Sequence, residues 1–162
     1  MTICGLLFFL LMGTPQAVTV PDVDALALSD EMKAYLDENI RPVVDPTQRM
    51  HTLVNTVFSE KFLNLTYDNS RTKTAIETWE SRSGNCLSFT NMFVAMARHV
   101  GLYTRFQEVV NLPTWNKHGN VIVLNLHINA VATVKNRRFS MDFNPYGDRR
   151  EHKRVVISDK RA

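Results

Sequence analysis

Three side chains in the sequence could together perform nucleophilic chemistry, namely Cys86, His127 and Asp142. A cysteine reacts as its thiolate, which forms readily where a base stands beside the thiol and an acceptor orients that base. Cys86 follows the helix-breaking pair Gly84-Asn85 and precedes an apolar stripe, so we expect it to begin a helix. The N–H groups of that first turn would favour a thiolate and could bind an oxyanion. In this pattern Cys86 is the candidate nucleophile, His127 the base and Asp142 the group that orients the base.

Each of these residues also has a plainer interpretation. A cysteine on an apolar stripe can be an inert core residue, and a strand histidine among asparagines can be an ordinary surface residue. The other histidines lie in loops or on helical surfaces, and no two of them have ligand spacing on one element, so we expect no metal site. A glycine-rich phosphate loop is also absent from the sequence, so no cofactor is expected.

The pairing of two strands decides whether His127 can reach Asp142. Alternating apolar residues predict strands over residues 121–134 and 138–143, joined by a turn at Lys135-Asn136. Two registers are open: one sets His127 and Asp142 directly opposite each other, and the other makes them diagonal neighbours. Both registers put the two side chains on one face, whereas a slip by one residue would separate them.

Hydrophobic periodicity predicts helices first and strands later. The helices are expected over residues 30–41, 50–62, 72–81 and 86–100. The last of them is the clearest, because Phe89, Phe93 and Met96 recur at helical spacing and Gly101 follows as a C-terminal cap. The strands are expected over residues 103–110, 121–134 and 138–143. This order of elements indicates an α+β fold.

Composition and charge exclude several classes of protein. The chain has 162 residues, of which 44% are hydrophobic and 22% charged, as in an ordinary globular domain. Two cysteines are too few for a disulfide-dense scaffold. The net charge of +3 comes from the tail over residues 148–162, which we expect to be a solvated helix or linker. A nucleic-acid binder would spread its bases over a folded surface, so no nucleic-acid partner is expected.

An apolar run over residues 3–12 precedes these elements. It is shorter than the roughly 20 residues of a membrane span and is typical of the core of a secretory signal, although no Lys or Arg precedes it. We therefore expect residues 1–17 to be a signal peptide and no stable membrane span, with a buried N-terminal helix as the alternative. Removal of the signal would leave Cys86 as the only cysteine of an exported protein, where an unpaired thiol is either intermolecular or reactive.

Three separated blocks resemble the core of the transglutaminase-like superfamily. The stretch SGNCLSF at 83–89 matches a Gly-x-Cys that opens a helix, and ARHVGLYTR at 97–105 matches the run that ends it. His127 on one strand and Asp142 at the start of DFNP on the next resemble the rest of the family's triad. The family often has His-Ala-Trp where this chain has HIN, and a tryptophan before the aspartate is also missing.

The resemblance implies a papain-like α+β domain over residues 72–147. A helical part over 18–71 would precede it, and residues 148–162 would be a charged tail or a linker to a missing C-terminal region. Cys86 would attack an amide or acyl carbon, His127 would carry the proton and Asp142 would hold the imidazole, so that the acyl group passes to an amine or to water. The substrate would be a peptide or protein.

The chain resembles in particular bacterial exported members that carry such a domain ahead of tetratricopeptide repeats. This implies a location in the bacterial periplasm or cell envelope, and it leaves room for protein partners bound through the missing repeats. The departures from the family's tryptophans keep a second hypothesis open. In it, the same fold serves as a non-catalytic module that binds peptides in the groove.

Overall fold

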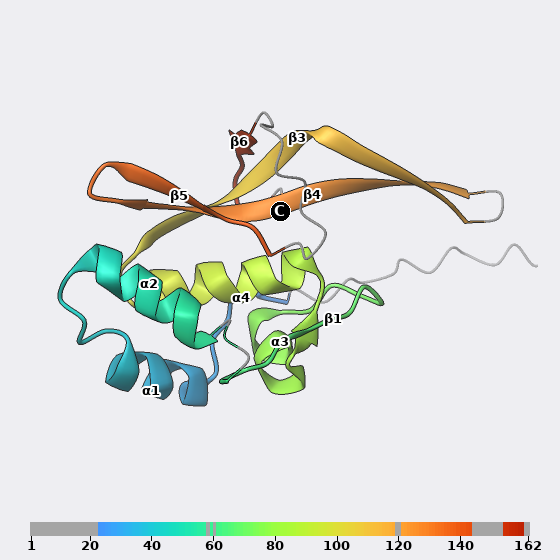
Figure 1. The fold of residues 1–162 in the computed structure, drawn as a ribbon. Coiled ribbons are helices and arrows are strands. Elements are labelled where there is room, and N and C mark those ends of the chain that lie inside the picture. Colours follow the sequence, from blue (N-terminus) through green and yellow to red (C-terminus); the bar gives the residue numbers. More distant parts are fainter. Residues whose placement is uncertain (1–22, 58, 60, 119–120, 144–153, 161–162) are drawn as a thin grey trace, which may run out of the picture.

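The computed structural model describes residues 23–57, 59, 61–118, 121–143 and 154–160, so the expected signal peptide over 1–17 lies outside the described residues. The helices in this part of the chain are α1 (Asp30–Asn39), α2 (Pro46–Val57), α3 (Ala75–Ser81) and α4 (Cys86–His99). They form a layer on one face of a sheet, as Figure 1 shows. Within the described residues, no helix has the length and apolar character needed to cross a membrane.

The sheet has the order β5-β4-β3-β6, and each neighbouring pair is antiparallel. Its strands are β3 (Tyr103–His118), β4 (Val121–Val134), β5 (Arg137–Met141) and β6 (Arg154–Val156). A separate parallel pair joins β1 (Thr66–Tyr67) to β2 (Ser83–Gly84), directly before α4. The α+β class expected from the sequence is confirmed.

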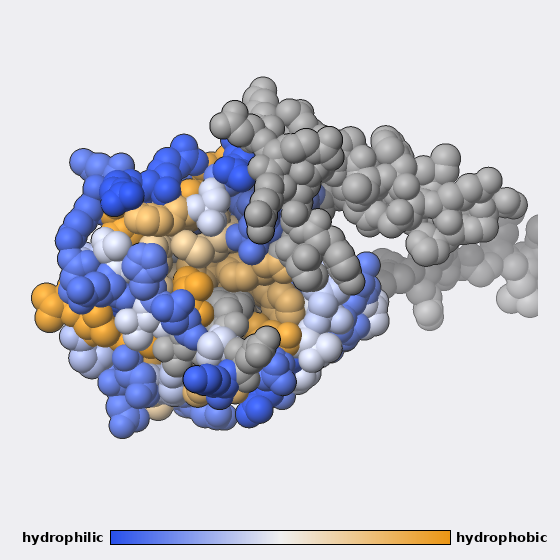
Figure 2. Space-filling view, viewed as in Figure 1, coloured by the Kyte–Doolittle hydropathy of each residue, from blue (hydrophilic) through white to orange (hydrophobic). Residues whose placement is uncertain are grey.

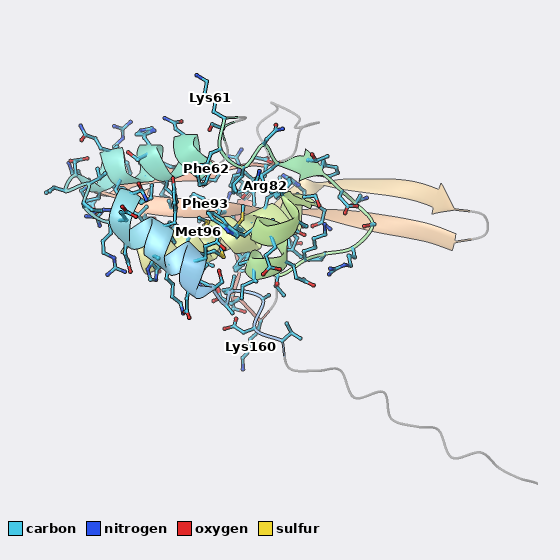
Figure 3. The ribbon with its side chains drawn as sticks, turned by 90° about the horizontal axis from the view of Figure 1, so that it is seen from below. Lys61, Phe62, Arg82, Phe93, Met96 and Lys160 are labelled. Carbon is cyan, nitrogen blue, oxygen red and sulfur yellow. The ribbon has the colours of Figure 1, made fainter. Side chains whose placement is uncertain are left out.

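Helix α4 lies between the other helices and the sheet and carries most of the core. Its side chains Met92, Phe93 and Met96 are fully buried, and Figure 3 shows Phe93 and Met96 in the middle of the helical layer. The sheet contributes Phe106 and Ala130 to the same hydrophobic cluster. Burying one such large side chain stabilises the fold by about 1.5–3 kcal/mol, so the packing holds α4 firmly against the sheet. Figure 2 shows apolar side chains in the middle of the helical face with polar ones around them.

Two helices begin elsewhere than the sequence predicts. The second starts at Pro46 instead of residue 50 and ends at Val57 instead of 62. Its start follows from Asp45, whose carboxylate accepts from the N–H groups of Thr47 at 2.9 Å and Gln48 at 3.1 Å, while proline suits the first helical position. The third starts at Ala75, three residues later than expected.

That later start of α3 has a specific cause in a capping box. Thr74 accepts from the N–H of Glu77 at 3.2 Å, and the Glu77 carboxylate accepts from the N–H of Thr74 at 2.8 Å. The two bonds fix the helix start at Ala75.

The strands also differ from the expected ranges. β3 continues to His118, well past residue 110, and pairs with β4 across a register irregularity between Val109 and Thr114. β5 ends at Met141, before residue 143. β6 was not predicted: it pairs with β3 within the region expected to be solvated, and Ile157 behind it is 5% exposed in the hydrophobic cluster.

Candidate active site

The first turn of α4 is built to begin at Cys86. Asn85 has extended backbone, and its side-chain oxygen accepts from the N–H of Ser88 at 2.9 Å, which makes it the N-cap. Gly84 precedes the cap because a Cβ there would lie 2.6 Å from the Cβ of Ser88. The Gly-x-Cys spacing therefore has a steric cause, and it delivers a half-buried free thiol at the helix start.

The hairpin between β4 and β5 brings His127 to Asp142. The Nε2 atom of His127 lies 2.9 Å from each carboxylate oxygen of Asp142. The side chain of His127 is 13% exposed and that of Asp142 is 39% exposed, so the pair lies at the border of the protein and solvent. Because the carboxylate of Asp142 accepts at Nε2, it fixes the orientation of the imidazole ring.

The turn of this hairpin selects one of the two registers that the sequence left open. Lys135 and Asn136 have φ angles of 47° and 62°, the left-handed conformation of a two-residue hairpin turn. The pairs run from Val134 with Arg137 to Ala130 with Met141. Asp142 follows the last of these pairs and is thus the diagonal neighbour of His127, not its direct partner.

Cys86 completes the group from the helical layer. Its side chain acts on the imidazole of His127, whose Nε2 atom is occupied by Asp142. The hydrogen bond to Asp142 and, after it, the one to Cys86 raise the pKa of His127 to about 9, although burial acts in the opposite direction. At neutral pH the imidazole is therefore protonated and lies between a sulfur and a carboxylate.

The structure thus brings together all three side chains singled out in the sequence. The arrangement holds a sulfur next to a protonated ring nitrogen at a helix N-terminus, where negative charge is stabilised. Such a group can supply a nucleophile and return a proton to a leaving group. Among the described residues, no cluster of three His, Cys, Asp or Glu side chains is suited to hold a metal ion.

Two polar features beside these residues were missed in the sequence. Asn129, two positions after His127, is fully buried, and its Oδ1 accepts from Nε2 of the buried Gln107 at 3.2 Å. This amide pair fills the position where the family often has tryptophan. Lys73 is also buried, 7% exposed, and forms an ion pair with Asp68 at 3.1 Å. Neither pairing has a signal in the sequence, because the partners come from distant segments.

Comparison with known proteins agrees with this fold. The family model described as the transglutaminase-like superfamily matches residues 33–143. A protein of Parabacteroides distasonis described as a candidate protease has a TM-score of 0.56 at 15% identity, over 78% of this chain and 26% of its own. A candidate cysteine protease of Cytophaga hutchinsonii has a TM-score of 0.52 at 17% identity, over 76% of this chain and 44% of its own. At these identities the likeness shows the fold alone, and this chain spans less than half of either protein. The comparison with curated proteins gave no match.

Proposed function

Because the chain belongs to the transglutaminase-like superfamily, we propose that it transfers acyl groups from peptide or protein amides through a thioester on Cys86. The observation that supports this most is the His127 imidazole, which is bonded to Asp142 and has Cys86 acting on the same ring. The elevated pKa of His127, about 9, keeps the catalytic proton on the imidazole at neutral pH, opposite the sulfur.

In the first half of the reaction the sulfur of Cys86 attacks the amide carbon. The C–S bond forms, the C–N bond breaks, and the proton on His127 passes to the departing amine. Asp142 stabilises the charged imidazole before this transfer and holds the ring afterwards. The N–H groups in the first turn of α4 would bind the oxyanion that forms on the attacked carbonyl.

In the second half a new acceptor attacks the thioester. Water or an amine gives its proton to the now neutral His127, the C–S bond breaks, and the thiol group is restored with the proton shared as before. Water yields hydrolysis and an amine yields transamidation. The residues described so far serve both outcomes equally, because the choice depends on which acceptor enters the groove.

Turnover of a peptide library tests this proposal. The library contains glutamine and ordinary backbone amides, and both cleavage and incorporation of a labelled primary amine are scored by mass spectrometry. We expect one of the two products with the full chain and none with Cys86→Ala. A thioester adduct on the Cys86 peptide, trapped at low pH, would identify the nucleophile. Turnover retained by Cys86→Ala would overturn the assignment.

A non-catalytic peptide-binding module is the second candidate, and the HIN sequence at 127–129 favours it. The buried Gln107–Asn129 pair includes the position where the family often has an aromatic side chain, so the packing behind His127 differs from the family pattern. This candidate predicts that library peptides bind to the wild-type chain and to Cys86→Ala alike, with no product from either.

We also propose that the protein is exported to the bacterial periplasm or cell envelope and acts there on peptides or proteins, with no nucleic-acid partner. The apolar run over residues 3–12 supports export. Protein purified from its native envelope should lack residues 1 to about 17 when its intact mass is measured. A full-length N-terminus in a cytosolic fraction would contradict this proposal.

A further inference from the structure

Lys73 is a buried cation that the proposed reaction does not use. It is 7% exposed, and its ammonium group has three acceptors: Asp68 Oδ2 at 3.1 Å, Ser81 Oγ at 3.2 Å and Ser83 Oγ at 2.6 Å. An ammonium group has three N–H donors, so every donor of Lys73 has a partner. A buried charge satisfied in this way is held in one place, because any movement would leave a donor without an acceptor.

The acceptors of Lys73 flank the turn between α3 and β2. Arg82, at the centre of this turn, has a φ of 52°, in the left-handed region that strains a residue other than glycine. Ser81 precedes Arg82 and Ser83 follows it, so one ammonium group joins both sides of the turn. Figure 3 labels Arg82 at this turn. Lys73 thus stabilises a strained conformation.

The backbone of Lys73 is tied to the Cys86 helix as well. Its N–H donates to Ser88 Oγ at 2.8 Å, and its carbonyl accepts from Asn91 Nδ2 at 3.3 Å. The hydroxyl of Ser88 in turn donates to the side-chain oxygen of Asn85, the N-cap of α4, at 2.9 Å. Lys73 therefore contacts the segment on both sides of Cys86: the strand before it and the first turn after it.

We infer that Lys73 is a positioning residue, which holds the turn at Arg82 and the first turn of α4 so that Cys86 meets His127. From Ser83 only Gly84 and the cap separate the ammonium contact from Cys86. A small change at the turn is therefore carried directly to the sulfur. The inference rests on the proposed function, since it concerns how the same nucleophile is placed.

Lys73→Met tests the inference in the full chain, because methionine fills the buried space without donating. The readouts are the titration of the His127 imidazole by NMR and the rate at which iodoacetamide alkylates Cys86 at pH 6, located by peptide mass. We expect the pKa of His127 to fall by about one unit or more as its sulfur partner is displaced. Alkylation should slow by about tenfold or more. Lys73→Arg, which keeps the charge, should restore part of both values.

Lys33→Met is the matched control, because Lys33 has an exposed pair with Asp30 and lies far from the site in the chain; it should change neither readout. Ser83→Ala keeps the lysine and removes its shortest contact together with the bond from the Ser83 hydroxyl to Ser81. It should change both readouts in the same direction, and it tests the inference if Lys73→Met does not fold. A wild-type His127 titration in the folded variants would overturn the inference, whatever their melting temperatures. A wild-type protein whose His127 itself titrates near its ordinary value would instead refute the pairing behind the proposed function.

Discussion

The two ends of α4 satisfy the open backbone groups of a helix in different ways. At the N-terminal end a neutral amide, Asn85, caps one N–H and leaves a half-buried thiol beside it. At the C-terminal end two arginines from outside the helix donate to backbone carbonyls, Arg41 to His99 at 2.6 Å and Arg49 to Val100 at 2.9 Å, while Arg98 of the last turn donates to Thr104 of β3 at 3.0 Å. Gly101, with φ of 80°, turns the chain away from this end.

The difference follows from the helix dipole. Positive charge stabilises the C-terminal end of a helix, and negative charge stabilises the N-terminal end. Guanidinium groups occupy the C-terminal end of α4 permanently, and Arg98 also binds Asp159 of the C-terminal segment at 2.6 Å. The N-terminal end instead presents the half-buried thiol of Cys86. One end of α4 therefore anchors the helix, and the other holds the proposed nucleophile.

Asp142→Ala should have the largest effect at the reactive end. Without the carboxylate, the orientation and tautomer of the His127 imidazole are no longer fixed. We therefore expect turnover to fall by about 10³- to 10⁴-fold while the fold is retained. The pKa of His127, raised to about 9 chiefly by this carboxylate, should fall, and the alkaline limb of any residual pH–rate profile should move to lower pH. Asp159→Ala, which removes a carboxylate from the anchoring end, is the control and should leave turnover unchanged. Undiminished turnover in Asp142→Ala would contradict the triad.

Arg98→Met should affect the other end alone. The variant loses bonds to the Thr104 carbonyl and to Asp159, so urea denaturation should show a loss of about 1–3 kcal/mol in the free energy of unfolding. Alkylation of Cys86 at pH 6, measured below the unfolding transition, should remain at the wild-type rate. A parallel loss of thiol reactivity would show that the two ends are coupled, and the division between anchor and reactive end would not hold.

Stability against pH provides a third comparison. His127 binds its proton more tightly in the folded chain than in the unfolded one, where its pKa is near 6.5. Its contribution to stability is therefore complete below about pH 6.5 and is lost as the pH rises through about 9. We expect a decrease of about 1–3 kcal/mol over this window, measured by urea denaturation. His127→Asn should abolish this part of the pH dependence, and an unchanged slope in the variant would assign it to other groups.

Asn85→Asp should have the smallest effect and separates capping from charge. Aspartate caps a helix as well as asparagine does, so the free energy of unfolding should change by only about 0.3 kcal/mol. Its negative charge, however, opposes a thiolate in the same turn. A penalty of about 0.3–1 kcal/mol corresponds to alkylation about two- to fivefold slower at pH 6. Asn39→Asp on the exposed surface of α1 is the control, and equal rates in both variants would remove the electrostatic argument.

The sequence predicted the parts of the site that depend on local pattern. The apolar stripe through Phe89, Phe93 and Met96 specified α4, and only one residue type at position 84 fits the space before Ser88. The sequence also limited the hairpin to two registers. The observed register places Asn136 at a positive φ, a conformation that asparagine tolerates.

The parts that could not be predicted depend on contacts between distant segments. A strand was expected to end at residue 110, but β3 continues past Pro113, because the irregular pairing between Val109 and Thr114 accommodates a residue that cannot donate to the ladder. The three residues of β6 lie among charged neighbours, and only pairing with β3 makes them a strand. The partners of Lys73 likewise become visible only when the chain is folded.

The two-residue turn at Lys135-Asn136 also affects the order in which the three side chains come together during folding. His127 and Asp142 are only 15 positions apart along a single hairpin, and hairpins of this kind form in about 1–10 μs. We expect the sulfur to arrive later, because Cys86 and His127 are 41 positions apart and contacts between distant positions form more slowly. A newly made chain would thus hold His127 and Asp142 together for some time before Cys86 reaches them, and exposure of the completed group during folding would be brief.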